Sequence, residues 1–270
     1  MSRRTLLTAV LTLALVAASC GDDDTAATTS AEAPTPTAGA RPDQPNTIST
    51  VEYLGFRAQA TFCGADAPAP ANEMAFSQPD DLGLSGIVTA VITTSCGDVV
   101  IELDADAAPE TVNSFVFLAE QDYFNGTVSH RVVSGFMIQA GDPTATGRAG
   151  PGYSIPDELP TEEGFVYARG TVAMANAGPN TGGSQFFMVL VDVPLPPSFS
   201  VFGMVTSGLD VMDRIAGVPT VARAAGQEPS SPLETVYIES VTIQRGWRSI
   251  STLILAIRMA ATHPRRSSPR

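Results

Sequence analysis

The chain has 270 residues, of which 44% are hydrophobic, and it carries a formal net charge of −13 at pH 7. This length is enough for one or two domains with a substantial core, and the acidic balance argues against nucleic acid as a partner. All fifteen basic residues are arginines, which excludes chemistry that needs lysine, such as a Walker A phosphate site, a Schiff base or a Ser–Lys dyad.

The first 19 residues have the pattern of a targeting segment. Arg3 and Arg4 precede an apolar stretch over residues 6–18, which is too short to span a membrane comfortably. Small residues then lead to Cys20, as in the lipobox of bacterial lipoproteins. We predict a lipoprotein signal peptide over residues 1–19 and lipidation of Cys20, which would anchor the protein to the outside of the bacterial cell membrane. An ordinary secretory signal is the alternative.

Two further segments precede the regular pattern. Residues 20–50 are rich in Thr, Ala and Pro and have few large apolar side chains, which predicts a disordered tether. Residues 51–86 mix Pro and Gly with scattered aromatic residues and predict an extended lead-in. Cys63 and Cys96 remain after signal cleavage, and an even count in an exported chain favours a disulfide, with two buried thiols as the alternative.

Regular elements begin near residue 87. The composition predicts a hairpin over residues 87–103 and a helix from Pro109, whose apolar residues then share one helical face. A second short helix is predicted near Met212, and a closing strand over residues 236–244. Further short strands, separated by Gly- and Pro-rich loops, are predicted at residues 131–133, 137–139, 172–174, 185–190 and 201–205. Many short strands with two helices favour a closed barrel.

The last 26 residues differ from the rest of the chain. Residues 245–270 carry arginines and no acidic residue, around an apolar stretch that is too short to span a bilayer. We interpret them as a basic C-terminal tail without a defined structure. A helix that lies on an anionic membrane surface is the alternative.

Common catalytic and ligand motifs are missing. Neither Cys63 nor Cys96 belongs to a C-x-x-C pair, so we expect no metal site and no cofactor. His130 and Ser184 could form the core of a hydrolase triad, although nothing in the local sequence supports this. We interpret His130 as a buried hydrogen-bonding residue.

Two segments carry a specific signal. They are HRVVSGFMIQAGD at residues 130–142 and MANAGPNTGGSQFF at residues 174–187. Together they resemble the cyclophilin family of peptidyl-prolyl cis/trans isomerases. Supporting matches lie, in family order, at residues 109–115, 150–158 and 201–205. The resemblance implies a mainly β fold, a closed eight-stranded antiparallel barrel capped by two helices, over residues 87–244.

The resemblance also implies an enzyme and its site. Arg131 would donate a hydrogen bond to the proline nitrogen as the X–Pro bond twists, and Gln139 would orient Arg131 and bind the substrate backbone. Phe136, Met137, Phe187 and Leu195 would line the pocket for the proline ring. Further substrate contacts are implied for Ala175, Asn176, Ala177, Gln185 and Phe199.

The chain departs from the family pattern in one pocket wall. Some members place a tryptophan and, five residues later, a histidine where this chain has Pro194 and Phe199. We therefore expect weak cyclosporin binding. The expected partners are proline-containing segments of exported proteins, and we expect a monomer. A non-catalytic peptide-binding or chaperone lipoprotein on the same fold is the alternative function.

Overall fold

The structure is a computed structural model that describes residues 46–244. The predicted signal peptide, Cys20, all but the end of the tether, and the basic tail lie outside the described residues. Within residues 46–244, no helix combines the length and apolarity needed to cross a bilayer.

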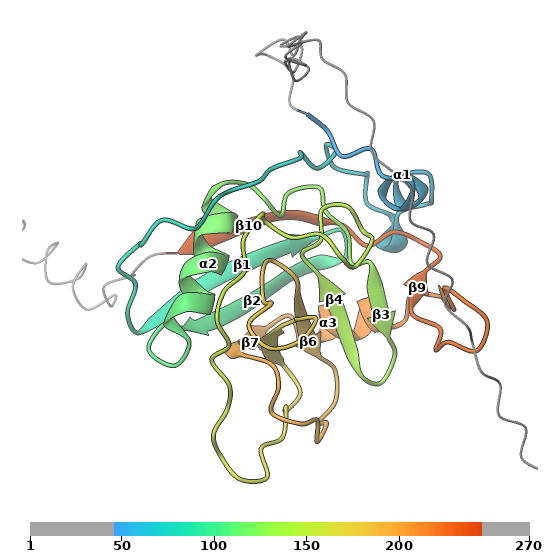
Figure 1. Ribbon diagram of the computed structural model, residues 1–270. Helices are drawn as coiled ribbons and strands as arrows, with labels where there is room; N and C mark the ends of the chain where they lie inside the picture. The colour runs from blue at the N-terminus through green and yellow to red at the C-terminus, as the bar shows by residue number, and fades with distance from the viewer. Residues whose placement is uncertain (1–45, 245–270) are drawn as a thin grey trace, which may run out of the picture. The chain divides into compact units, whose positions relative to one another are not determined.

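Eight strands form one antiparallel sheet that curls around a core, in the order β10-β1-β2-β7-β5-β6-β4-β3 (Figure 1). The bounds are β1 Ile87–Thr94, β2 Gly97–Asp104, β3 Arg131–Val133, β4 Met137–Ala140, β5 Thr171–Met174, β6 Phe186–Val189, β7 Val201–Ser207 and β10 Ile238–Gln244. The eight-stranded antiparallel prediction is confirmed. A short hairpin of β8 (Thr220–Val221) and β9 (Ser231–Pro232) was not predicted.

The prediction that the barrel is closed is slightly overstated. In the part of the chain that the structure describes, no continuous ladder joins the edge strands β3 and β10. Just before these strands, an isolated bridge pairs Val128 with Tyr237, and the backbone N–H of Ser129 donates to the carbonyl of Val236 at 2.9 Å. The sheet is therefore a curled barrel that these few contacts join at its seam.

Alternation along the strands separates the inner face of the sheet from the outer face. Val132, Ile138 and Met188 are paired across β3, β4 and β6, and all three belong to the main buried core. Because successive side chains of a strand point to opposite faces, the residues beside these three lie on the outer face. The outer face of β3, β4 and β6 is thus available to form a site.

Helices cover the barrel as the sequence predicted. α2 (Pro109–Glu120) begins with proline and packs against β10 and β2, whereas α3 (Leu209–Ala216) packs against β2 and β4. Ala108 offers no side-chain cap to α2. Instead, the carboxylate of Glu158 accepts hydrogen bonds from the backbone N–H groups of Glu110 and Thr111, both at 2.9 Å. An acidic group at this position also suits the helix dipole.

The lead-in packs on the barrel, and the prediction that it is extended is wrong for its first part. Its first residues form α1 (Val51–Arg57), because Thr50 caps the helix and Tyr53 and Phe56 are buried. A 3-10 turn follows at Phe62–Gly64. Cys63 and Cys96 form a disulfide, as the even cysteine count had favoured, and it joins the lead-in to the β1–β2 turn.

Candidate active site

A row of paired residues crosses the outer face of the sheet. Arg131 of β3 pairs with Gln139 of β4, which pairs with Phe187 of β6. Phe187 then pairs with Ala173 of β5, and Ala173 with Val201 of β7. Because residues directly opposite each other on neighbouring strands share a face, this register places Arg131 and Gln139 beside an apolar surface.

The apolar surface is a cluster separate from the barrel core, and we call it the outer apolar cluster. Its buried members are Val133, Met137, Tyr167, Ala173, Phe187 and Val189, and the partly buried residues packed against them are Phe136, Phe165, Ala175, Val193, Leu195, Phe199 and Val201. The cluster contains all the residues predicted to line the proline pocket. Phe199 belongs to the same cluster and packs edge-on against Phe187, with ring centroids 5.2 Å apart.

Arg131 lies half-buried at the edge of the outer apolar cluster. Its Nη1 atom is 3.3 Å from Oε1 of Gln139 and 4.0 Å from the sulfur of Met137. Burial lowers the pKa of Arg131 from its ordinary value, whereas the negative charge of Glu228 raises it. An arginine remains protonated despite such burial. Within residues 46–244 it forms no salt bridge, so its remaining N–H groups can serve a ligand.

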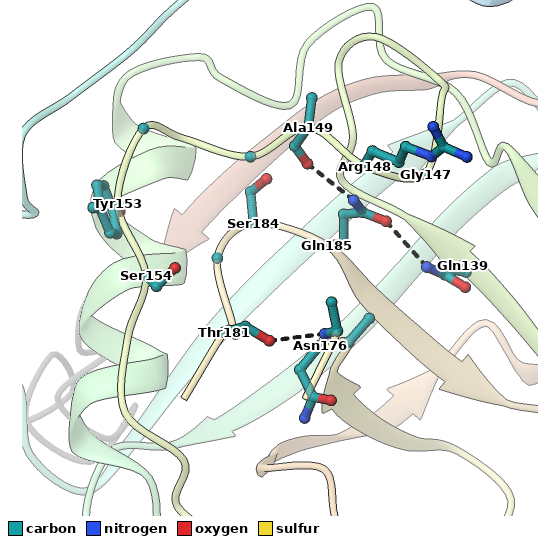
Figure 2. Close-up of a pocket in the computed structure, with 15 residues that line it drawn as sticks. Gln139, Gly147, Arg148, Ala149, Tyr153, Ser154, Asn176, Thr181, Ser184 and Gln185 are labelled. Carbon is teal, nitrogen blue, oxygen red and sulfur yellow. Dashed lines mark hydrogen bonds between the residues drawn. The ribbon is translucent and has the colours of Figure 1, made fainter. Parts of the chain in front are cut away.

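A chain of amide hydrogen bonds holds Gln139 in place. Its Nε2 atom donates to Oε1 of Gln185 at 3.1 Å, and Nε2 of Gln185 donates to the backbone carbonyl of Ala149 at 2.9 Å (Figure 2). Because each amide uses its nitrogen in this chain, the oxygen of Gln139 faces Arg131. The amide chain thus fixes the side chain of Gln139 next to Arg131, and the role of Gln139 in catalysis stays a prediction.

A cavity of about 790 Å³ lies beside this amide chain (Figure 2). Glycines and small or polar residues dominate its lining, and among the lining residues that the structure describes only Arg148 has a charged side chain. Three backbone segments form most of the wall: residues 147–154, 175–177 and 181–185. Ala175, Asn176, Ala177 and Gln185, which were predicted to contact substrate, therefore border one cavity.

The segment at Asn176 is arranged to offer its backbone. The N–H of Ala175 donates to the carbonyl of Gln185, and the N–H of Ala177 donates to Oγ1 of Thr181, both at 2.8 Å. The backbone N–H and the backbone carbonyl of Asn176 form no hydrogen bond with any described residue. Its side chain is fixed by donation to the carbonyl of Ser198. An extended ligand could therefore pair with Asn176.

The hydrolase hypothesis finds no support in the geometry. Oγ of Ser184 donates to the carbonyl of Gly141 at 2.6 Å and lies 3.2 Å from the hydroxyl of Tyr123. His130 is buried, and neither ring nitrogen has a partner within residues 46–244 at good hydrogen-bond geometry, although the backbone of Val128 acts on the imidazole as a weak hydrogen-bond partner. Its interpretation as a hydrogen-bonding residue stays a prediction. Burial lowers the pKa of His130 to about 4, although Asp142 opposes the shift.

Asp142 is a structural residue that the sequence interpretation missed. Its fully buried carboxylate accepts hydrogen bonds from the backbone N–H groups of Thr144 at 2.8 Å, Gly147 at 2.6 Å and Arg148 at 3.0 Å. It thereby folds the loop that forms one cavity wall. A signal was present, since an acidic residue directly follows an apolar strand and precedes a loop of Thr and Gly. Residues 46–244 contain no group of three or more His, Cys, Asp or Glu that could hold a metal ion.

Comparison with known proteins agrees with this site. Residues 89–243 match the family model described as cyclophilin type peptidyl-prolyl cis-trans isomerase/CLD. A protein named peptidyl-prolyl cis-trans isomerase B from Streptomyces anulatus is 42% identical over 173 residues, covering 57% of this chain and 95% of that protein. Probable peptidyl-prolyl cis-trans isomerase B from Mycobacterium tuberculosis H37Rv is 42% identical over 170 residues. This match covers 58% of the present chain and 54% of the relative, so the chain spans about half of the relative's length.

Solved structures give the same assignment. A cyclophilin type isomerase from Cryptosporidium parvum aligns with a TM-score of 0.52 and 29% identity, covering 59% of this chain and 99% of that one. A second structure of that protein, in the presence of the dipeptide Ala-Pro, aligns with a TM-score of 0.52 and 30% identity, covering 58% of this chain and 99% of that one. From the family match over more than half of its length, the chain belongs to the cyclophilin-type peptidyl-prolyl cis-trans isomerase family.

Proposed function

We propose that the protein catalyses cis/trans isomerisation of X–Pro bonds, with Arg131 as the catalytic residue. The observation that carries the proposal is the position of Arg131. Its guanidinium lies beside the outer apolar cluster, is hydrogen-bonded to Gln139, and forms no salt bridge within the described residues. Family membership and a relative studied in the presence of Ala-Pro support the same reaction.

The reaction needs a donor but no nucleophile. Rotation about a peptide bond faces a barrier of about 18–20 kcal/mol, and an X–Pro bond takes tens to hundreds of seconds to isomerise unaided. As the bond twists, the nitrogen lone pair ceases to delocalise into the carbonyl and can accept a hydrogen bond. A donor at that nitrogen therefore binds the twisted state better than the planar state, which lowers the barrier.

The surrounding residues suit this task. Phe136, Met137 and Phe187 would hold the proline ring, because burial of an apolar ring is favourable and leaves the ring's nitrogen near Arg131. Gln139 would keep the guanidinium aimed at that nitrogen through the amide chain. Asn176 would bind the backbone of an extended peptide.

The test is whether the purified full chain accelerates exchange. NMR exchange spectroscopy on a short X–Pro peptide should show faster cis/trans interconversion at substoichiometric protein concentrations. Chemical-shift perturbation of the peptide without faster exchange would favour a non-catalytic peptide-binding or chaperone protein. Turnover of an ester substrate, which the His130–Ser184 hypothesis requires, is not expected.

We also propose that the protein acts outside the cytoplasm as a lipid-anchored monomer and assists the folding of exported proteins. The support is the sequence: the apolar stretch at residues 6–18 leads to Cys20, and a tether-like segment follows. Mass measurement of the mature N-terminus from the native host should show a lipid-modified Cys20. An unmodified N-terminus near this position would indicate secretion instead.

A further inference from the structure

The lead-in is the part of the structure that the family does not account for. The family match begins at residue 89. Residues 46–82, which include most of the lead-in and the end of the tether before it, pack on the barrel, and we call residues 46–82 the strap. Figure 1 shows it running from α1 along the barrel past α2. It is attached by the Cys63–Cys96 disulfide and by paired backbone hydrogen bonds around Thr235. Two further contacts attach the strap to the loop that follows β4 and forms one wall of the cavity.

The first contact lies at the start of that loop. The hydroxyl of Thr50 donates to the backbone carbonyl of Thr144 at 2.7 Å. The next residue, Ala145, is fully buried in a small apolar cluster with Tyr53 and Phe56 of α1. The strap thus fixes the backbone at the point where the loop leaves β4.

The second contact lies at the far end of the loop. The backbone N–H of Phe76 donates to the carbonyl of Pro151 at 2.7 Å. The Phe76 ring packs edge-on against Phe117, with centroids 5.1 Å apart. A Cβ at Gly152, whose φ is +97°, would meet the carbonyl oxygen of Phe76 at 2.7 Å. The strap and the loop are therefore in direct contact here, and only glycine fits.

The loop between these two contacts forms part of the site. Gly147, Arg148, Ala149 and Gly150 line the cavity, and the carbonyl of Ala149 accepts the hydrogen bond of Gln185 that ends the amide chain from Arg131. Pro151 packs directly on Gly183, another cavity-lining residue, since its Cδ lies 3.1 Å from the place where a Cβ of Gly183 would stand. A displacement of the loop would therefore alter the cavity and remove the acceptor that ends the amide chain, whereas no residue of the loop belongs to the outer apolar cluster.

We propose that the strap is a positioning element of the peptide-binding site, with Phe76 and Thr50 as its positioning residues. It holds the cavity wall preformed, so that peptides long enough to reach past the proline pocket bind without first ordering the loop. A residue in an extended peptide spans about 3.3 Å, so a capped dipeptide stays near the proline pocket and a longer peptide reaches the cavity. This inference rests on the proposed isomerase function.

The test compares two substrates on full-chain variants. Phe76→Ala and Thr50→Val should each raise KM and lower kcat/KM by about tenfold for a hexapeptide with a central proline, the size expected when several groups lose their preorganisation. For capped Ala-Pro the same variants should keep KM within about twofold of wild type, because a dipeptide does not reach the cavity, whereas any loss of kcat through the amide chain would be shared by both substrates. Phe62→Ala is the matched control, because Phe62 lies in the same strap and packs on the core without a described contact to the loop. It should lower stability without changing the ratio of the two substrates.

Four outcomes bear on the proposal. Equal changes in KM for both substrates would show a purely structural role and overturn the proposal, as would unchanged kinetics in both variants. If Phe76→Ala does not fold, Thr50→Val still tests the proposal, because valine has nearly the same shape as threonine and removes only the hydroxyl that bonds to the loop. If wild type accelerates neither substrate, the proposed function fails, and the ratio of hexapeptide to dipeptide Kd in the same variants still tests the strap.

Discussion

Removal of the Cys63–Cys96 disulfide should destabilise the protein strongly without altering its active site. The two cysteines are 33 residues apart in sequence, and the loop-entropy relation for a ring of this size gives a loss of about 4 kcal/mol of unfolding free energy. For a domain of about 150–250 residues, each kcal/mol lowers Tm by roughly 2–4 °C. The double variant Cys63→Ser, Cys96→Ser should therefore melt roughly 8–16 °C lower than the oxidised wild type.

Urea denaturation followed by far-ultraviolet circular dichroism would measure this difference. Wild type unfolded under reducing conditions is the control, and it should match the double variant. Neither cysteine lines the cavity or belongs to the outer apolar cluster, so isomerisation of capped Ala-Pro should be unchanged at 25 °C. A loss below about 1 kcal/mol would refute the view that the bridge is a main constraint on the lead-in.

Two other residues give separable effects. Gln139→Leu keeps the side-chain volume but removes the acceptor for Arg131, so kcat should fall about tenfold with little change in KM; an unchanged kcat would mean that Gln139 does not orient Arg131. His130 should make stability pH-dependent, because its folded pKa of about 4 lies below its ordinary value of 6.5 and the unfolded chain therefore binds the proton first. Its contribution is complete above about pH 6.5 and is lost as the pH falls towards 4. Between pH 6.5 and 4, the unfolding free energy of wild type should thus fall by roughly 3 kcal/mol more than that of His130→Phe. If the unfolding free energies of the two proteins fall equally with pH, the lowered pKa of His130 is contradicted.

Much of the barrel and its site could be predicted from the sequence, because their signals are local. The strand-like composition of residues 87–103 predicted the hairpin, and the resemblance to cyclophilins identified Arg131, Gln139 and Phe187. The structure brings these residues together through strand register. Their roles in the reaction stay predictions until activity is measured.

The elements that were missed depend on distant contacts. α1 has only seven residues, so its own propensity is a weak signal, and it is stabilised by burial of Tyr53 and Phe56 against the barrel. The packing of the strap was also missed, because individual hydrogen bonds and a disulfide attach it to the barrel and these leave no periodic pattern in the sequence.

The central claim is that Arg131 stabilises the twisted X–Pro bond, and kcat/KM of Arg131→Ala on capped Ala-Pro tests it most directly. Removal of one donor of this kind from a transition state lowers the rate by about 10²–10³-fold. Arg214→Ala is the matched control, because Arg214 bonds to the carbonyl of Cys96 and lies outside the cluster and the cavity. We predict a loss of about 10²–10³-fold for Arg131→Ala, with a native circular dichroism spectrum and less than a twofold change for Arg214→Ala. A folded Arg131→Ala protein with nearly wild-type kcat/KM would contradict the account.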